Sequence, residues 1–182
     1  MEQLAIDELM SRAKCIPMRA LANEIEAARD KGRYCIVFDK NENCPVFFTY
    51  KATMRDFYKE TLAVKIGKKT KEEALEILRA ALVYSMKIGD TFVINVDKLN
   101  PDFKTEWQDD EEFPLDTICD FDEWRLETNY LKIVKEDENK DLMGDPGYYS
   151  MHENFTMVFL ARYETDQQMV EVFNNIPDSD MM

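Results

Sequence analysis

The stretch YCIVFDKNENCPVFF, residues 34–48, is an apolar run, then a turn rich in acids and asparagines, then a second apolar run. The first run, with its β-branched and aromatic residues, predicts a strand that is buried on both faces, as in a parallel sheet. In open parallel sheets, ligands bind beyond the carboxyl ends of the strands. The turn between Asp39 and Pro45 is therefore the first place to look for a nucleotide or a metal ion.

This turn begins like a calcium-binding loop but does not continue as one. Asp39, Asn41 and Asn43 take the first, third and fifth positions of such a loop. The sixth position, which needs glycine, is Cys44, and the twelfth, which needs a bidentate glutamate, is Tyr50. The chain also has a single histidine and no CxxC pair, whereas zinc usually takes four ligands in close pairs. The sequence therefore predicts no metal site.

The same turn lacks what a phosphate-binding loop requires. Such a loop surrounds phosphates with the amides of a glycine-rich backbone and adds a lysine, but residues 40–51 contain no glycine. Pro45 has no amide, and Asp39 and Glu42 would place negative charge beside a phosphate. No GxGxxG pattern occurs in the chain. We therefore predict no cofactor.

A second candidate position lies at the end of another apolar run. The segment FVINVDK, residues 92–98, reaches Asp97, the kind of acid that holds magnesium in an ATPase. The next residue is Lys98, where a glutamate would be needed to activate water. Asp39 and Asp97 are the cofactor-binding candidates that the sequence offers. We expect no catalytic residues and no enzyme.

Hydrophobic periodicity and turn residues predict the other elements outward from this stretch. Two capping boxes, Thr70 to Glu73 and Thr165 to Gln168, mark helix starts, and Gly89 marks a helix end. We expect helices at 2–15, 18–31, 44–60, 70–88 and 165–176, and strands at 34–39, 62–67, 91–99 and 155–163. The aromatic and β-branched residues of 44–60 would also suit a strand, and one or two further helices are expected around 121–134.

This alternation of strands and helices predicts an α/β fold with a mostly parallel, doubly wound sheet between helices. An α+β fold with some antiparallel pairing is the alternative. We expect one domain over residues 1–182, with N-terminal helices in 2–31, a sheet core in 34–99 and 155–176, and an acidic, loop-rich insertion in 100–151. The polar tail, 177–182, is expected to fray.

The charge of the chain restricts its partners. It has 37 acidic and 23 basic residues, a formal net charge of −14. Such a surface repels nucleic acids and anionic membranes but suits a basic protein partner. No apolar run reaches membrane length and no apolar leader is evident near residue 2, so a cytoplasmic location is expected.

Aromatic residues in the acidic insertion are the partner-binding candidates. Trp107, Phe113, Phe121 and Trp124 lie among acids, and aromatic anchors surrounded by charge are typical of interface cores. The alternative is that both tryptophans pack the insertion onto the sheet.

The order of four segments resembles the degenerate AAA+ modules of dynein heavy chains, above all the fifth module of the motor. The segments are YCIVFDKNENCPVFFTYKATMRDF, LAVKIG, EEALEILRAALVYSMKIGDTFVINVDKLNPDF and ENFTMVFLARYETDQQMVEVFNNIP. Similar modules end ciliary proteins that carry IQ motifs and ankyrin repeats. The resemblance covers about residues 20 to 177. It implies a P-loop-like fold, and a cytoskeletal or ciliary context.

The chain departs from the catalytic members of this family, because it has no phosphate-loop lysine and has Lys98 in place of the catalytic glutamate. We therefore expect a non-catalytic protein-interaction or structural module with a degenerate nucleotide site. Two alternatives remain open. One is a nucleotide-binding regulatory domain or NTPase with a non-standard phosphate site, and the other is a small-molecule or peptide sensor near Asp39 and Asp97.

Overall fold

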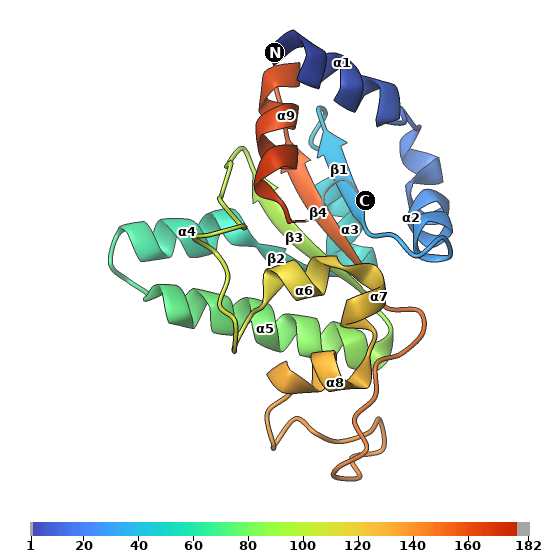
Figure 1. Cartoon of the computed structure of the whole chain (residues 1–182), viewed down its shortest axis with the longest axis vertical. Coiled ribbons are helices and arrows are strands. Elements are labelled where there is room, and N and C mark those ends of the chain that lie inside the picture. Colours follow the sequence, from blue (N-terminus) through green and yellow to red (C-terminus); the bar gives the residue numbers. More distant parts are fainter. Residues whose placement is uncertain (1, 178–182) are drawn as a thin grey trace.

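The computed structural model describes residues 2–177, and its centre is a four-stranded sheet in which every neighbouring pair of strands is parallel (Figure 1). The strand order is β1-β4-β3-β2. The strands are β1 (Cys35–Asp39), β2 (Thr53–Asp56), β3 (Thr91–Asp97) and β4 (Thr156–Arg162). The predicted parallel α/β fold is confirmed.

Helices precede, connect and follow these strands. In chain order they are α1 (Glu2–Arg12), the 3-10 turn η1 (Met18–Ala20), α2 (Leu21–Arg29), α3 (Cys44–Lys51), α4 (Phe57–Lys65), α5 (Lys71–Ile88), α6 (Leu115–Cys119), α7 (Phe121–Trp124), α8 (Glu127–Tyr130), the 3-10 turn η2 (Leu131–Ile133) and α9 (Asp166–Asn175). No helix within residues 2–177 is both long enough and apolar enough to cross a membrane.

Helices cover both faces of the sheet, which is the doubly wound arrangement. Val93 of β3 and Val158 and Leu160 of β4 are buried in one cluster with residues of α2 and α3. Their neighbours along the strands point the other way, and Ile94 and Phe159 are buried against α5 and the insertion. This alternation follows from the two-residue period of a strand. Burial on both faces explains why β3 and β4 are apolar almost throughout.

The ends of α5 confirm the boundaries that the sequence predicts. Thr70 and Glu73 form a reciprocal capping box, and Gly89 ends the helix in the left-handed conformation, with φ at 73°. A side chain at Gly89 is also excluded by packing, because an added Cβ would lie 2.5 Å from Nδ1 of His152. The second capping box, Thr165 with Gln168, starts α9.

The segment 44–67 differs from the prediction. The expected helix over 44–60 is interrupted, because α3 ends at Lys51 and the edge strand β2 follows. The expected strand at 62–67 is wrong: its first residues belong to α4, whose amino end is capped by the Asp56 side chain accepting from the Lys59 amide. A short apolar run fits a half-buried helix as well as a strand, so periodicity alone could not distinguish the two.

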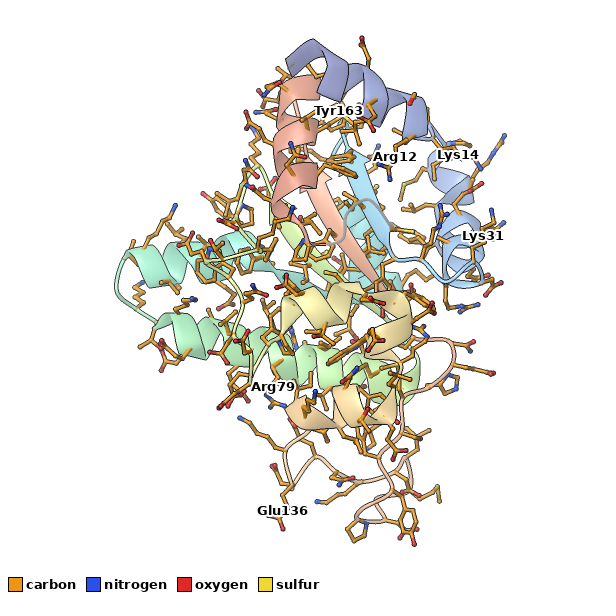
Figure 2. The ribbon with its side chains drawn as sticks, viewed as in Figure 1. Arg12, Lys14, Lys31, Arg79, Glu136 and Tyr163 are labelled. Carbon is orange, nitrogen blue, oxygen red and sulfur yellow. The ribbon has the colours of Figure 1, made fainter. Side chains whose placement is uncertain are left out.

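The insertion is ordered and is fixed to α5 by a buried arginine. Arg79 is only 1% exposed, and its guanidinium donates to both carboxylate oxygens of Glu76 and of Glu138, at 2.6–2.9 Å, and to the carbonyl of Ile133 at 2.7 Å. Figure 2 shows Arg79 on α5, facing the insertion. We call these four residues the Arg79 cluster.

The Arg79 cluster is strongly electrostatic. Hydrogen bonds from Arg79 lower the pKa of Glu76 to about 2. Burial acts to raise the pKa of Glu138, but the hydrogen bonds from Arg79 and from the Lys135 amide, together with the charge of Arg79, outweigh it and lower that pKa. Residues 178–182, which make up most of the tail that is predicted to fray, lie outside the described residues.

Candidate functional site

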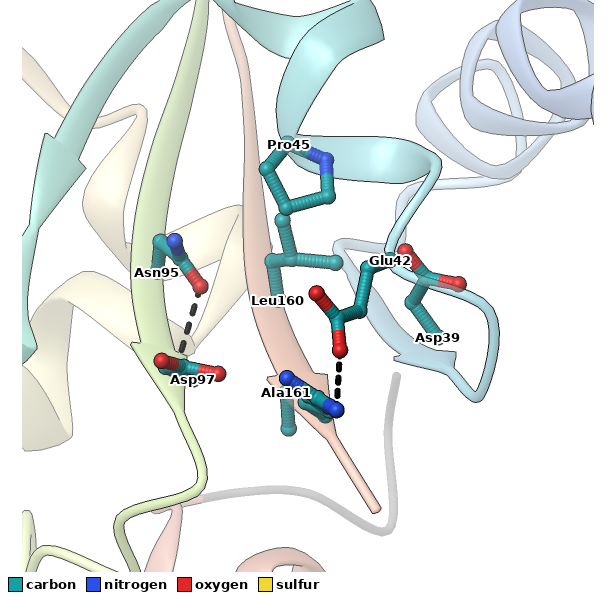
Figure 3. Close-up of a pocket in the computed structure, with 8 residues that line it drawn as sticks. Asp39, Glu42, Pro45, Asn95, Asp97, Leu160 and Ala161 are labelled. Atoms are coloured by element: carbon teal, nitrogen blue, oxygen red, sulfur yellow. Dashed lines mark hydrogen bonds and ion pairs between the residues drawn. The ribbon is translucent and has the colours of Figure 1, made fainter.

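A small cavity lies at the carboxyl ends of β1, β4 and β3, where a parallel sheet normally binds its ligand (Figure 3). Its volume is about 220 Å³, and we call it the carboxyl-edge pocket. It is lined by Asp39, Glu42, Pro45, Asn95, Asp97, Leu160, Ala161 and Arg162. The structure thus brings together Asp39 and Asp97, the two candidates from the sequence, on either side of the end of β4.

Asp39 fills the turn that follows β1. One of its carboxylate oxygens accepts from the amide of Asn41 at 2.9 Å, and the other accepts from the amide of Cys44 at 2.7 Å. These amides are the groups that would surround a phosphate, and the next residue, Pro45, has none to offer. The carboxylate also lies favourably at the amino end of α3. In this turn the Asp39 carboxylate therefore occupies the amides that would otherwise bind a phosphate.

Asp39 also affects the neighbouring thiol. Burial, followed by the negative charge of Asp39, raises the pKa of Cys44 to about 12. The thiol is therefore protonated near neutral pH. A protonated thiol is a poor nucleophile, so Cys44 is unsuited to covalent chemistry.

The arginine of the pocket is already paired. Arg162, the last residue of β4, forms an ion pair with Glu42, marked by the dashed line from Glu42 in Figure 3. This contact ties the turn after β1 to the end of β4. It also neutralises the one cationic side chain in the pocket lining, which an anionic ligand would need.

Asp97 is the carboxylate of the pocket that remains available. Its amide donates to Oδ1 of Asn95 at 3.1 Å, but its own carboxylate makes no hydrogen bond or ion pair within residues 2–177. The following Lys98 points to Glu164, at 2.9 Å, rather than to Asp97. A single free carboxylate is not a magnesium site, which needs several oxygen ligands in octahedral geometry.

Backbone conformation marks the same pocket. Glu42, with φ at 59°, and Asp97, with φ at 50°, are the non-glycine residues with positive φ in the described part of the chain. This left-handed conformation is uncommon, although aspartate tolerates it better than most residues. Across the region that the structure describes, no group of three or more His, Cys, Asp or Glu residues could hold a metal ion.

The four aromatic candidates of the insertion are buried or half-buried. Trp107, Phe113 and Trp124 are buried in the main core, and the Trp107 ring packs edge-on against Phe57, with centroids 4.9 Å apart. Phe121 is half-buried beneath the guanidinium of Arg125, 3.6 Å from its ring centroid. The tryptophans therefore pack the insertion onto the sheet, and Trp107, Phe113 and Trp124 have almost no exposed surface to offer a partner.

Other apolar residues of the insertion are exposed, and the sequence analysis missed them. Leu142, Met143 and Tyr148 have 65%, 87% and 72% of their surface exposed. The loop that carries them is held by its own hydrogen bonds. Oδ1 of Asp141 accepts from the amides of Met143 and Asp145, both at 2.8 Å. The glycine-rich GDPG turn within this loop is the signal that could have identified it.

No known family model, curated protein or solved structure matches the chain.

Proposed function

We propose that the chain is a non-catalytic protein-interaction module whose nucleotide position is degenerate. The observation that carries this proposal is the turn after β1, where Asp39 accepts from the amides of Asn41 and Cys44. A phosphate would have to displace this carboxylate and would then face the charges of Glu42 and Asp97. Such like-charge contacts are costly in a partly desolvated site.

The resemblance to the fifth AAA+ module of dynein heavy chains and to modules of ciliary proteins agrees with this proposal. In that relationship, the chain keeps a parallel sheet and has lost the catalytic groups. We propose a cytoplasmic protein that acts within the cytoskeleton or a cilium.

A basic protein segment with apolar side chains is the partner that suits the insertion. Leu142, Met143 and Tyr148 offer exposed apolar surface on a loop held by internal hydrogen bonds, so binding would cost little ordering of this loop. The same loop carries Asp141 and Asp145, and the chain as a whole is strongly acidic. Complementary charge would steer a basic partner to this surface.

Nucleotide binding is tested by thermal unfolding of the full chain with Mg-ATP, Mg-GTP, Mg²⁺ alone and Ca²⁺. We expect no shift with any of them, because a ligand stabilises a protein only if it binds the native state. The alternative function is a nucleotide-binding regulatory domain or NTPase with a non-standard site, in which Asp97 would hold the Mg²⁺ of the nucleotide together with phosphate oxygens and water. A rise of several degrees with a nucleotide but not with Mg²⁺ alone would support that alternative.

The partner surface is tested with a synthetic peptide of alternating lysine and leucine. We expect the chain to bind it, more weakly as salt is added, and the double variant Leu142→Ser with Met143→Ser to lower the affinity about tenfold. The control is Val46→Ser with Tyr50→Ser, which removes exposed apolar residues from α3 instead. Equal loss in both double variants would contradict a binding surface on the insertion.

A further inference from the structure

A second, larger cavity lies at the opposite edge of the sheet, where β3 and β4 begin. Its volume is about 520 Å³, and it lies between α2 and α3 over the amino ends of the strands. We call it the amino-edge cavity. Small-molecule sites in proteins commonly have volumes between about 300 and 1,000 Å³. It shares no lining residue with the carboxyl-edge pocket.

The floor of this cavity contains a buried hydroxyl without a partner. Thr156, the first residue of β4, is 2% exposed, and its Oγ1 makes no hydrogen bond within residues 2–177. Because side chains alternate along a strand, Thr156 points to the same face as Val158 and Leu160, toward α2 and α3. A buried hydroxyl normally has a hydrogen-bond partner, so an unpartnered one calls for an explanation.

A second hydroxyl lies beside it. Thr91, the first residue of β3, is the register partner of Thr156 and also lines the cavity. Its amide donates to Asp90, but its hydroxyl has no partner within residues 2–177. Two adjacent hydroxyls can each donate and accept a hydrogen bond, so the floor suits a ligand with a polar end.

Apolar side chains from both helices also line the cavity. Ile25 of α2 is buried on one side, and Phe47 of α3 is half-buried on the other, with its ring packed edge-on against Phe48 at 5.2 Å between centroids. An aromatic ring seated between Ile25 and Phe47 would gain apolar contact and a ring–ring interaction.

The charged residues at the opening of the cavity leave one free charge of each sign. Arg29 is bonded to Asp30 and to the carbonyl of Asn154, and Asp90 is bonded to Thr53 and Thr91. The other two charged lining residues are Glu26 and Lys51.

Glu26 on α2 and Lys51 on α3 are exposed lining residues. Neither has an ion-pair partner in the described chain, and they do not pair with each other. A ligand that carries both an ammonium and a carboxylate would match this pair, whereas a ligand with one net charge would meet repulsion from one of them.

We propose that the amino-edge cavity binds a free amino acid with a hydroxylated aromatic side chain, such as tyrosine. The phenol hydroxyl bonds to Thr156 and Thr91, and the ring lies between Ile25 and Phe47. The ammonium and carboxylate groups face Glu26 and Lys51 at the opening. This site is independent of the partner surface proposed above.

The ligand chemistry is tested by calorimetric titration of the full chain with matched probes. L-tyrosine is compared with L-phenylalanine, which lacks the hydroxyl, with tyramine, which lacks the carboxylate, and with para-hydroxyphenylpropionate, which lacks the ammonium. We expect L-tyrosine to bind and each of the others to bind about tenfold more weakly, the loss of about one hydrogen bond or ion pair. N-acetyl-L-tyrosine amide represents tyrosine within a peptide, and binding of it as tight as L-tyrosine would overturn the free amino acid as ligand.

The residue assignment is tested with Thr156→Val, which has a similar shape but no hydroxyl. We expect this variant to lose most of the preference for L-tyrosine over L-phenylalanine, because only the Thr91 hydroxyl is left to bond the phenol, while the control Thr49→Val, on the exposed side of α3, keeps the full preference. Because the variant removes an unpartnered hydroxyl, it should fold normally, and a melting curve checks this. No binding of L-tyrosine by the wild type, or an unchanged preference in Thr156→Val, would overturn the proposal.

Discussion

Arg79 and Thr156 are both polar and almost fully buried, yet their surroundings are opposite. Arg79 has carboxylate or carbonyl partners for each of its three nitrogens, whereas the Thr156 hydroxyl has none. The other buried side-chain atom without a partner in the described residues is Nε1 of Trp124, which lines neither cavity.

The two regions differ in whether the protein itself supplies the hydrogen-bond partners of a buried polar group. Where it does not, we infer that an external ligand supplies them. The partners of Arg79 come from α5 and from the insertion, so the buried arginine has a structural role: it holds these two parts together. The hydroxyl at the amino-edge cavity has no such internal explanation. The following predictions test this contrast, from the largest expected effect to the smallest.

Replacing Arg79 should have the largest effect on stability. Arg79→Met removes the buried cation and leaves Glu76 and Glu138 facing each other without it, so we expect a loss of about 3 to 5 kcal/mol in the free energy of unfolding. Urea unfolding measures this loss. Arg19→Met is the control, because Arg19 is exposed on η1. A loss below about 1 kcal/mol for Arg79→Met would mean that the buried Arg79 does not hold the insertion on α5.

Gly89→Ala should have the next largest effect, and it tests how rigid the amino edge is. The new Cβ would meet His152 at 2.5 Å and would require a left-handed alanine, so we expect a loss of about 2 to 3 kcal/mol. Gly67→Ala is a matched control, because Gly67 has nearly the same φ but no atom within 4 Å of an added Cβ. Equal losses in the two variants would mean that His152 simply moves aside.

Acid should weaken the Arg79 cluster. The pKa of Glu76 is held at about 2 in the folded protein, below the ordinary value of 4.5, so its contribution is complete above pH 4.5 and is lost as the pH falls toward 2. Because Glu76 is partly exposed, we expect this contribution to be no more than about 1 kcal/mol. Urea unfolding of the wild type and Glu76→Gln measures it. A difference between them that did not shrink over this pH range would contradict the prediction.

Thr156→Val should have the smallest effect, with the opposite sign. Removing a buried hydroxyl that has no partner should leave stability unchanged or raise it by up to about 1 kcal/mol. Thr61→Val is the matched control, because the buried Thr61 hydroxyl donates to the carbonyl of Phe57 at 2.9 Å and its loss should cost about 1 kcal/mol. If Thr156→Val were the more damaging of the two, the hydroxyl would have a partner within the protein.

Local sequence signals were sufficient for much of the fold. The apolar runs that became β1, β3 and β4, the capping box at Thr70 and the glycine at 89 each act over a few residues, and all appear in the structure. The edge strand β2 was missed because TMRD has little apolar character and lies on the rim of the sheet.

The sites were predicted less fully, because they depend on distant partners. The meeting of Asp39 and Asp97 follows from the rule that parallel strands end at one edge. Arg79, in contrast, stands within the apolar stripe of α5, and one of its partners, Glu138, is 59 residues away. The sequence does not show either that the Thr156 hydroxyl lacks a partner, because this depends on how α2 and α3 pack over β4.

The strand order also has a consequence for the making of this protein. Within the described part of the chain, β1 pairs with β4 and with no other strand, although residues in register, such as Cys35 and Val158, lie about 120 residues apart along the chain. On a ribosome, β1 therefore emerges long before its partner exists, with an apolar edge that could pair with other chains. A nascent chain that stops before β4 cannot close its sheet, so we expect such fragments to depend on chaperones and to aggregate without them.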